Sequence, residues 1–175
     1  MNKTLGMLSA IVLLACGNVA RASDGFGAVR CGSDIPKALI GQRMSNERVV
    51  VIEERHKALG LKDLGGSEIS DRVFLASWRI CGDEYAVLEE KDVVRDVLKL
   101  PPHSRAAPEF VGTCQTNGKQ MPGTIIAILD NRKGAQDLPA TAAWKIDEAG
   151  KRFVKLPVGK LLCPRDGVIT ADGGL

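Results

Sequence analysis

The sequence predicts an α+β domain that consists mainly of an antiparallel sheet, with six to eight short hairpin-linked strands and one short helix near the start. Apolar and polar residues alternate along several segments, which is the period of a half-buried strand. Turn signals such as Asn117-Gly118 separate these segments. Only residues 33–41 combine the signals of a helix start and a helix end. We expect the sheet to pack against that helix, and a barrel-like curl is one form it can take.

The first 22 residues have the three parts of a secretory signal peptide. Lys3 supplies a positive charge, Leu5 to Ala15 form an apolar run, and Ala20 and Ala22 are small residues before a cleavage point. The run is shorter than the ~20 residues that a bilayer span requires, and no later segment is long and apolar enough to span. We therefore expect a periplasmic or secreted protein that begins at Ser23.

Lipidation at Cys16 is the alternative for this segment. Leu13-Leu14-Ala15-Cys16 is similar to a bacterial lipobox, although Leu14 is bulkier than the usual residue at its position. A diacylated Cys16 would tether the domain to a membrane through Gly17 to about Ser33. The two alternatives differ in where the protein is held and not in how it folds.

Cleavage after Ala22 leaves 153 of the 175 residues, which is the size of one domain. It also leaves an even number of cysteines, namely Cys31, Cys81, Cys114 and Cys163. An even number in an exported chain predicts two disulfides. We favour joining the first to the second and the third to the fourth, because each bridge then staples one half of the chain, but the other two pairings stay open. Without a C-x-x-C pair, and with only His56 and His103 to assist, zinc is disfavoured.

Charge and motifs exclude several classes of ligand. After cleavage, 22 basic residues face 21 acidic residues with the two signs interspersed, which is typical of a solvated surface and not of a nucleic-acid interface. No phosphate-binding loop or cofactor fingerprint occurs, so we expect no cofactor and no metal. Gly25-Phe26-Gly27 lacks a preceding strand and a correctly spaced third glycine, so Ser23 to Arg30 is expected to be a flexible lead-in.

The predicted helix is defined by four signals: a cap at Ser33 or Asp34, Pro36 in the first turn, Ala38 to Ile40 as the body and Gly41 as the stop. In the next segment, Glu47 to His56, the β-branched run Val49-Val50-Val51-Ile52 predicts a strand. Lys57 to Asp71 carries three glycines and predicts a turn or a short helix, with its leucines packing inward.

The middle of the chain predicts three successive strands. Arg72 to Ile80 alternates with Phe74, Ala76, Trp78 and Ile80 on one face. Tyr85 to Glu90 returns antiparallel, and Val93 to Leu100 follows after a turn at Lys91-Asp92. Pro101 to Pro108 is the most loop-like stretch.

The last part of the chain predicts further hairpins. Phe110 to Gln115 is a strand, Asn117-Gly118 a type I′ turn, and Thr124 to Leu129 a central strand with apolar residues on both faces. Asn131 to Pro139 is a polar loop. The remaining predicted elements are a strand with alternating Ala142, Trp144 and Ile146, its partner Phe153 to Leu156, and a short edge at Leu161 to Cys163. We expect one stapled domain over residues 23–163 and a flexible tail over 164–175.

The sequence lacks a recognisable catalytic set. His103 and Ser104 are neighbours in a loop, which does not make them a nucleophile and its base. Glu53 and His56 project from opposite faces of the predicted strand, so one metal could not bind both. The adjacent acids Glu53-Glu54, Asp83-Glu84 and Glu89-Glu90 are expected to be solvated, and the aromatic residues Phe74, Trp78, Trp144 and Phe153 are expected in the core.

The stretch PPHSRAAP is interpreted as either a plain connection or a proline-stiffened loop that binds a protein partner through His103, Ser104 and Arg105. We therefore expect a non-catalytic exported binding module, such as an inhibitor or an envelope accessory protein, with a protein partner in the envelope or outside the cell. The alternative is a small extracytoplasmic hydrolase, which requires two facing acids, at least one with a strongly raised pKa. A purely structural role is the third option.

Overall fold

The structure is a computed structural model that describes residues 24–131 and 135–169. The predictions on Cys16, on cleavage between Ala22 and Ser23, and on residues 170–175 of the expected tail lie outside the described residues.

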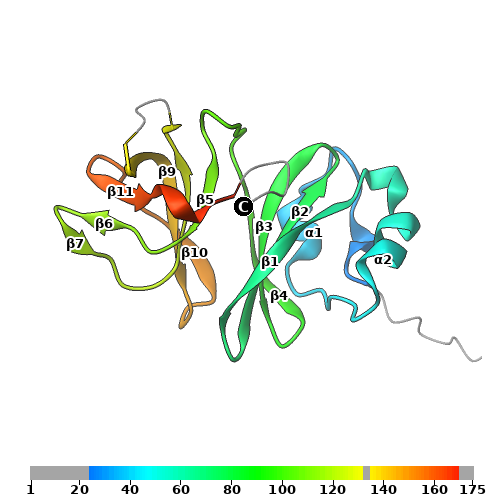
Figure 1. Cartoon of the computed structure of the whole chain (residues 1–175). Coiled ribbons are helices and arrows are strands. Elements are labelled where there is room, and N and C mark those ends of the chain that lie inside the picture. The colour runs from blue at the N-terminus through cyan, green and yellow to red at the C-terminus, as the bar shows by residue number, and fades with distance from the viewer. Residues whose placement is uncertain (1–23, 132–134, 170–175) are drawn as a thin grey trace, which may run out of the picture.

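Two antiparallel sheets form most of the described chain (Figure 1). The first is a meander in the order β1-β2-β3-β4, with bounds Lys62–Ser70, Val73–Ile80, Asp83–Glu90 and Val93–Lys99. The second has the order β12-β5-β8-β9-β11-β6-β7, and β10 pairs with β9. Its bounds are β5 Glu109–Gly112, β6 Gln115–Thr116, β7 Lys119–Gln120, β8 Ile125–Leu129, β9 Asp137–Asp147, β10 Arg152–Lys155, β11 Leu161–Pro164 and β12 Val168–Ile169. The predicted α+β class with antiparallel strands is confirmed.

The meander lies between two other layers, as Figure 1 shows. A helical layer packs against one face and consists of η1 (Phe26–Ala28), α1 (Ile35–Leu39), α2 (Val49–Arg55) and η2 (Lys57–Leu59). That face carries the buried residues Ala76, Trp78, Ile80, Tyr85 and Val87. The opposite face carries Val73, Leu75, Ala86 and Leu88, which pack against Ile126 and Ile146 of the second sheet. Alternation along β2 and β3 thus gives the meander two apolar faces.

The strand predicted at Val49 to Ile52 is wrong, because these residues begin helix α2. Ile52 alone is buried in this helix, whereas the three valines are exposed. β-branched residues disfavour a helix by less than ~1 kcal/mol each, so tertiary contacts can outweigh them. Here Ile52 enters the core beside Phe26 and Trp78, and Arg55 binds Asp24.

The flexible lead-in predicted for Ser23 to Arg30 is also wrong from Asp24 onward. Phe26 and Val29 are fully buried, and Asp24 is only 3% exposed. A tether from a lipidated Cys16 would therefore end before Asp24 and not near Ser33, because Asp24 is already part of the folded body.

The turn or short helix predicted for Lys57 to Asp71 is wrong in its second half, where β1 forms an edge strand beside β2. Leu61 is buried as expected, but Leu59 and Leu64 are only half-buried. A Cβ at Gly66 would lie 2.5 Å from the ring of Phe74, so this glycine makes room for that ring and does not mark a turn. The described residues form twelve strands against six to eight predicted, because β1 and the two-residue strands were not expected.

The predicted helix and the favoured disulfide pairing are confirmed. Asp34 caps α1 by accepting a hydrogen bond from the amide of Lys37, and Gly41 follows the helix with a positive φ of 83°. Cys31 is joined to Cys81 and Cys114 to Cys163. The first bridge ties the segment after η1 to the β2–β3 turn, and the second ties the β5–β6 connection to β11.

The second sheet differs from the prediction at its ends. β8 is central and fully buried, as expected. The Asn117-Gly118 turn is present but joins β6 to β7 and not to β8. β9 begins at Asp137, inside the predicted polar loop, and β11 lies between β9 and β6 and not at an edge. The tail prediction is wrong for residues 164–169, because Pro164 belongs to β11 and residues 165–169 form η4 (Arg165–Gly167) and β12, a partner of β5.

Candidate functional site

The helical layer covers only part of its face of the meander. Along β2, Ala76, Trp78 and Ile80 are buried beneath this layer. Phe74 continues the same row of side chains, yet 43% of it is exposed. The layer therefore ends before the strand does, and it leaves an aromatic ring at the uncovered end of the face.

Two hollows meet at this end and share Phe74 and Glu89, and we call them together the Phe74 groove. One, of about 220 Å³, lies between the helical layer and the sheet and is lined by Met44, Val49, Ile52, Gly66, Trp78 and other residues. The other, of about 430 Å³, has a rim with the carboxylates Glu68, Asp71 and Asp92 and the cations Arg72 and Lys91. The groove thus joins an apolar compartment to a mainly acidic one.

Strand register sets the row of side chains across the groove. Phe74 pairs with Glu68 on β1 and with Glu89 on β3, so the three residues lie side by side on one face of the sheet. The ring of Phe74 lies over Gly66, which has no side chain to displace it. A carboxylate therefore stands on each side of the ring.

Glu89 is a partly buried carboxylate in the groove. Its carboxylate makes no hydrogen bond and no ion pair within residues 24–131 and 135–169, although it is only partly exposed. Burial, with a contribution from the charge of Asp92, raises the pKa of Glu89 to about 7. The carboxylate is therefore close to half ionised at neutral pH.

Glu90, the next residue, shows the opposite behaviour. It points to the other face and binds Lys151 at 2.7 Å and Arg95 at 2.8 Å. The hydrogen bond from Lys151 lowers the pKa of Glu90 below its ordinary value. The prediction that Glu89 and Glu90 are simply solvated is wrong for both, because one is shielded and the other is paired.

The aromatic residues are less uniformly buried than predicted. Trp78 is in the core, where Phe26 packs edge-on with ring centroids 5.0 Å apart. Trp144 and Phe153 are half-buried, and Phe74 is exposed in the groove. The period-2 pattern placed Phe74 on the correct face, but it carried no information on where the covering layer stops.

The structure places the residues of the predicted partner-binding loop in two different environments. His103 points inward with 8% of its side chain exposed, and its Nε2 lies 2.9 Å from Glu84 Oε2. Ser104 and Arg105 are exposed, and the backbone of Ser104 exchanges two hydrogen bonds with Ala107. The loop brings His103 to Glu84 and Glu109 and not to the hydroxyl of Ser104.

Glu84 and Glu109 lie on either side of His103, whose Nε2 is 2.9 Å from Oε2 of Glu84 and 4.0 Å from Oε2 of Glu109. Burial raises the pKa of Glu109. The charge of His103 lowers this pKa, and the negative charge of Glu84 raises it. Sequence adjacency could not reveal this cluster, because its members come from β3, a loop and β5.

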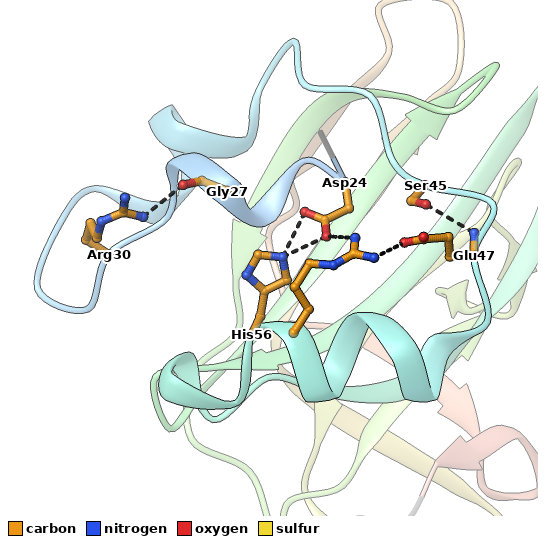
Figure 2. A network of polar contacts seen from close by, with 7 residues as sticks. Asp24, Gly27, Arg30, Ser45, Glu47 and His56 are labelled. Atoms are coloured by element: carbon orange, nitrogen blue, oxygen red, sulfur yellow. Dashed lines mark hydrogen bonds and ion pairs between the residues drawn. The ribbon is translucent and has the colours of Figure 1, made fainter. Parts of the chain in front are cut away.

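A separate polar network holds the start of the described chain to α2 (Figure 2). His56 Nε2 lies 2.8 and 2.7 Å from the two carboxylate oxygens of Asp24, and Arg55 donates to Asp24 at 2.6 Å and pairs with Glu47. Burial raises the pKa of Asp24, but the hydrogen bonds and charges of His56 and Arg55 outweigh it and hold that pKa below its ordinary value. The hydroxyl of Ser45 accepts a hydrogen bond from the amide of Glu47. Among the described contacts, no serine hydroxyl or thiol is hydrogen-bonded to the pair of His56 and Asp24.

Glu53 and His56 do not share a site, but the predicted reason was wrong. They lie on a helix and its C-cap and not on opposite faces of a strand. Glu53 binds the amide of Asp63 and the ammonium group of Lys62, while His56 turns to Asp24.

Comparison with known proteins finds no matching family model, no matching curated protein and no matching solved structure. In the part of the chain that the structure describes, no helix combines the length and the apolar character needed to cross a membrane.

Proposed function

We propose that the protein is an extracytoplasmic, non-catalytic binding module that captures a basic side chain of a protein partner in the Phe74 groove. Its two disulfides favour an oxidising compartment outside the cytosol. One observation carries the proposal: the carboxylate of Glu89, which has no hydrogen-bond or ion-pair partner among residues 24–131 and 135–169, stands beside the exposed ring of Phe74.

A lysine or arginine side chain from a partner can pair with Glu89 and pack on Phe74. Its charged head gives Glu89 a hydrogen-bond donor and a counter-charge, an interaction worth about 1.5–3 kcal/mol. Its aliphatic stem packs on Phe74, and a cation over the ring adds roughly 0.5–1 kcal/mol. The rim carboxylates Glu68, Asp71 and Asp92 attract cations to the groove before contact is made.

Apolar surface beside the groove indicates what flanks the basic residue in the partner. Val49 and Val50 at the start of α2 are 39% and 63% exposed, and Val49 lines the groove. A single side chain bound by the interactions above yields only weak affinity. We therefore propose that the partner presents a basic residue next to an apolar one.

The proposal is tested with a capped pentapeptide that carries lysine and leucine at neighbouring positions, titrated into ¹⁵N-labelled protein. A matched peptide in which norleucine replaces lysine keeps the stem and removes the charge. We expect shifts at Phe74 and Glu89 with the lysine peptide and roughly tenfold weaker binding with the norleucine peptide.

Variants assign the effect to the groove. Glu89→Gln and Phe74→Ala should each weaken binding of the lysine peptide by about tenfold. Glu54→Gln is the matched control, because Glu54 is an exposed acid of α2 that pairs only with Lys57 among the described residues. Equal affinity for both peptides, or an unchanged affinity in Glu89→Gln, would refute this assignment.

A further inference from the structure

The polar cluster at the other end of β3 has a different chemistry and does not depend on the proposed function. Glu84 stands at the start of β3, on the face that packs against the second sheet, whereas Glu89 stands near its end on the opposite face. Five residues of strand separate the two by roughly 17 Å. Glu84 meets His103 from the loop and Glu109 from the first position of β5.

We propose that Glu84, His103 and Glu109 bind one divalent transition-metal ion, with Zn²⁺ as the preferred ion. One nitrogen and two carboxylate oxygens, one from each residue, lie within 4.8 Å of one another. Three protein ligands that leave a fourth position open are a recurrent zinc arrangement. The imidazole nitrogen favours Zn²⁺ over Mg²⁺ and Ca²⁺, which take oxygen ligands.

The spacing of the ligand atoms suits an ion of this size. His103 Nε2 lies 2.9 Å from Glu84 Oε2 and 4.0 Å from Glu109 Oε2. Two zinc bonds of about 2.0–2.1 Å at a tetrahedral angle place their ligand atoms roughly 3.4 Å apart. Both distances are within about 0.6 Å of that value, so small side-chain rotations complete the site. The separation of 4.0 Å is too long for a direct hydrogen bond between His103 and Glu109.

The backbone sets the orientation of the imidazole. Nδ1 of His103 lies 3.2 Å from the carbonyl oxygen of Pro101, which can only accept, so a hydrogen bond between them needs a proton on Nδ1. Nε2 is therefore the ring nitrogen that is available to an ion held between the two carboxylates. A backbone carbonyl behind the distal nitrogen is the usual support of a metal-binding histidine.

Arg79 holds Glu84 in a comparable way. Its Nε and Nη2 donate to Glu84 Oε1 at 3.2 and 2.6 Å, and Oε2 is left to face His103. Arg79 and Glu84 are directly paired across β2 and β3, so the register of the sheet fixes this contact. The guanidinium therefore positions a ligand without itself approaching the ion.

Glu109 provides the independent sign that something is to be bound. Its side chain is only 5% exposed, and Oε1 is buried without a hydrogen-bond partner among the described residues. A buried carboxylate oxygen without a partner costs on the order of 1–3 kcal/mol or more. Glu109 pairs with Ile128 of β8, so the sheet fixes the backbone position from which the carboxylate projects.

An ion has a path to the cluster. A hollow of about 230 Å³ adjoins Glu84 and His103 and is walled by Gly82, Asp83, Pro101 and Pro102. Its polar wall suits a water molecule in the fourth coordination position. The amide of Leu100 donates to the carbonyl oxygen of Glu84 at 2.9 Å, and Pro101 and Pro102 restrict the backbone that leads from there to His103.

The test uses the mature, disulfide-bonded chain, treated with a chelator and titrated with ZnCl₂ against a chromophoric zinc indicator. We expect one Zn²⁺ per chain and a shift of the His103 ring nitrogen signals that marks binding at Nε2 with Nδ1 protonated. Glu109→Gln, which keeps the shape of the side chain, should weaken Zn²⁺ binding by at least about 100-fold, and His103→Gln by as much. Glu54→Gln and Glu89→Gln should bind Zn²⁺ like the wild type.

Three results would overturn the proposal. They are no Zn²⁺ binding at millimolar concentration, Zn²⁺ signals at His56 and not at His103, and equal affinity in wild type and Glu109→Gln. The ring nitrogen measurement is made on the wild type, so it decides the question even where a variant fails to fold. Because Glu89→Gln separates the groove from this cluster, failure of the zinc site leaves the peptide result unaffected.

Discussion

The two ends of strand β3 place carboxylates in opposite circumstances. At Glu84 the chain supplies fixed partners, Arg79 and His103, and a second buried acid, Glu109, completes an enclosed cluster. At Glu89 the chain supplies none among its described residues, and the carboxylate opens onto a groove. The first arrangement suits a small ion held inside the protein, and the second suits a cation that arrives on another molecule.

The two ends of β3 differ because the helical layer covers only part of one face of the meander, whereas the second sheet covers the other face. The helical layer buries Ala76, Trp78 and Ile80 along β2 but leaves Phe74 43% exposed. The second sheet, in contrast, buries Val73, Leu75, Ala86 and Leu88 on the opposite face. One face of the meander is therefore closed and the other is open at one end.

The largest expected loss of stability follows from a change in the cluster of Glu84, His103 and Glu109. Removal of the imidazole in His103→Ala leaves Glu84 and Glu109 facing each other in a buried space. We expect a loss of about 3–5 kcal/mol in the free energy of unfolding of the metal-free protein at pH 7, measured with urea. The double variant His103→Ala with Glu109→Gln should recover a large part of this loss, and strict additivity would show that the three groups do not act together.

Neighbouring residues of β2 compare the two faces directly. Leu75 is 2% exposed on the closed face, whereas Phe74 is 43% exposed on the open face. Leu75→Ala should lower the free energy of unfolding by about 3 kcal/mol and Phe74→Ala by about 1 kcal/mol, although Phe74 is the larger residue. Equal losses in urea unfolding would mean that the groove is closed in solution.

Glu89→Gln should stabilise the protein, and the effect should depend on pH. The pKa of Glu89 rises from 4.5 to about 7 on folding, so its favourable contribution is complete below pH 4.5 and is lost as the pH rises through 7. At pH 8 we expect the variant to be more stable than the wild type by on the order of 2 kcal/mol, and at pH 4 to be equal to it. Glu90→Gln is the matched control and should destabilise at neutral pH, because pairing lowers the pKa of Glu90.

A smaller effect links the pH to ligand binding. A cationic side chain binds the ionised form of Glu89, so affinity for the lysine peptide should rise by up to about tenfold between pH 6 and pH 8. The Glu89→Gln variant should lose this dependence and the Glu54→Gln variant should keep it. Peptide affinity that is flat across this pH range in the wild type would argue against contact with Glu89.

The sequence predicted the fold where local pattern and tertiary packing agree. Period-2 alternation found β2, β3 and β9, and the disulfide pairing that was favoured among three open ones is the one present. The sequence-based prediction was wrong at Val49 to Ile52, because burial of Ile52 and the ion pair of Arg55 with Asp24 outweigh the low helix propensity of β-branched residues. It failed again at β1, where Gly66 serves the ring of Phe74 and not a turn.

The candidate sites were harder to predict than the strands. Alternation separates Glu89 from Glu90 by face, so the sequence held a signal that one acid points toward the helical layer. Where that layer ends depends on packing across the molecule, and no local pattern records it. The cluster of Glu84, His103 and Glu109 depends on three elements that meet only in the folded chain.

The most direct test of the proposed function is the NMR titration of the Glu89 side-chain carboxyl carbon, with and without the lysine peptide. We predict a pKa of about 7 for Glu89 in the free protein and a fall in that pKa when the peptide is bound. A Glu89 carboxyl that titrates near its ordinary value of 4.5, and whose pKa the peptide leaves unchanged, would contradict the proposed capture of a basic side chain.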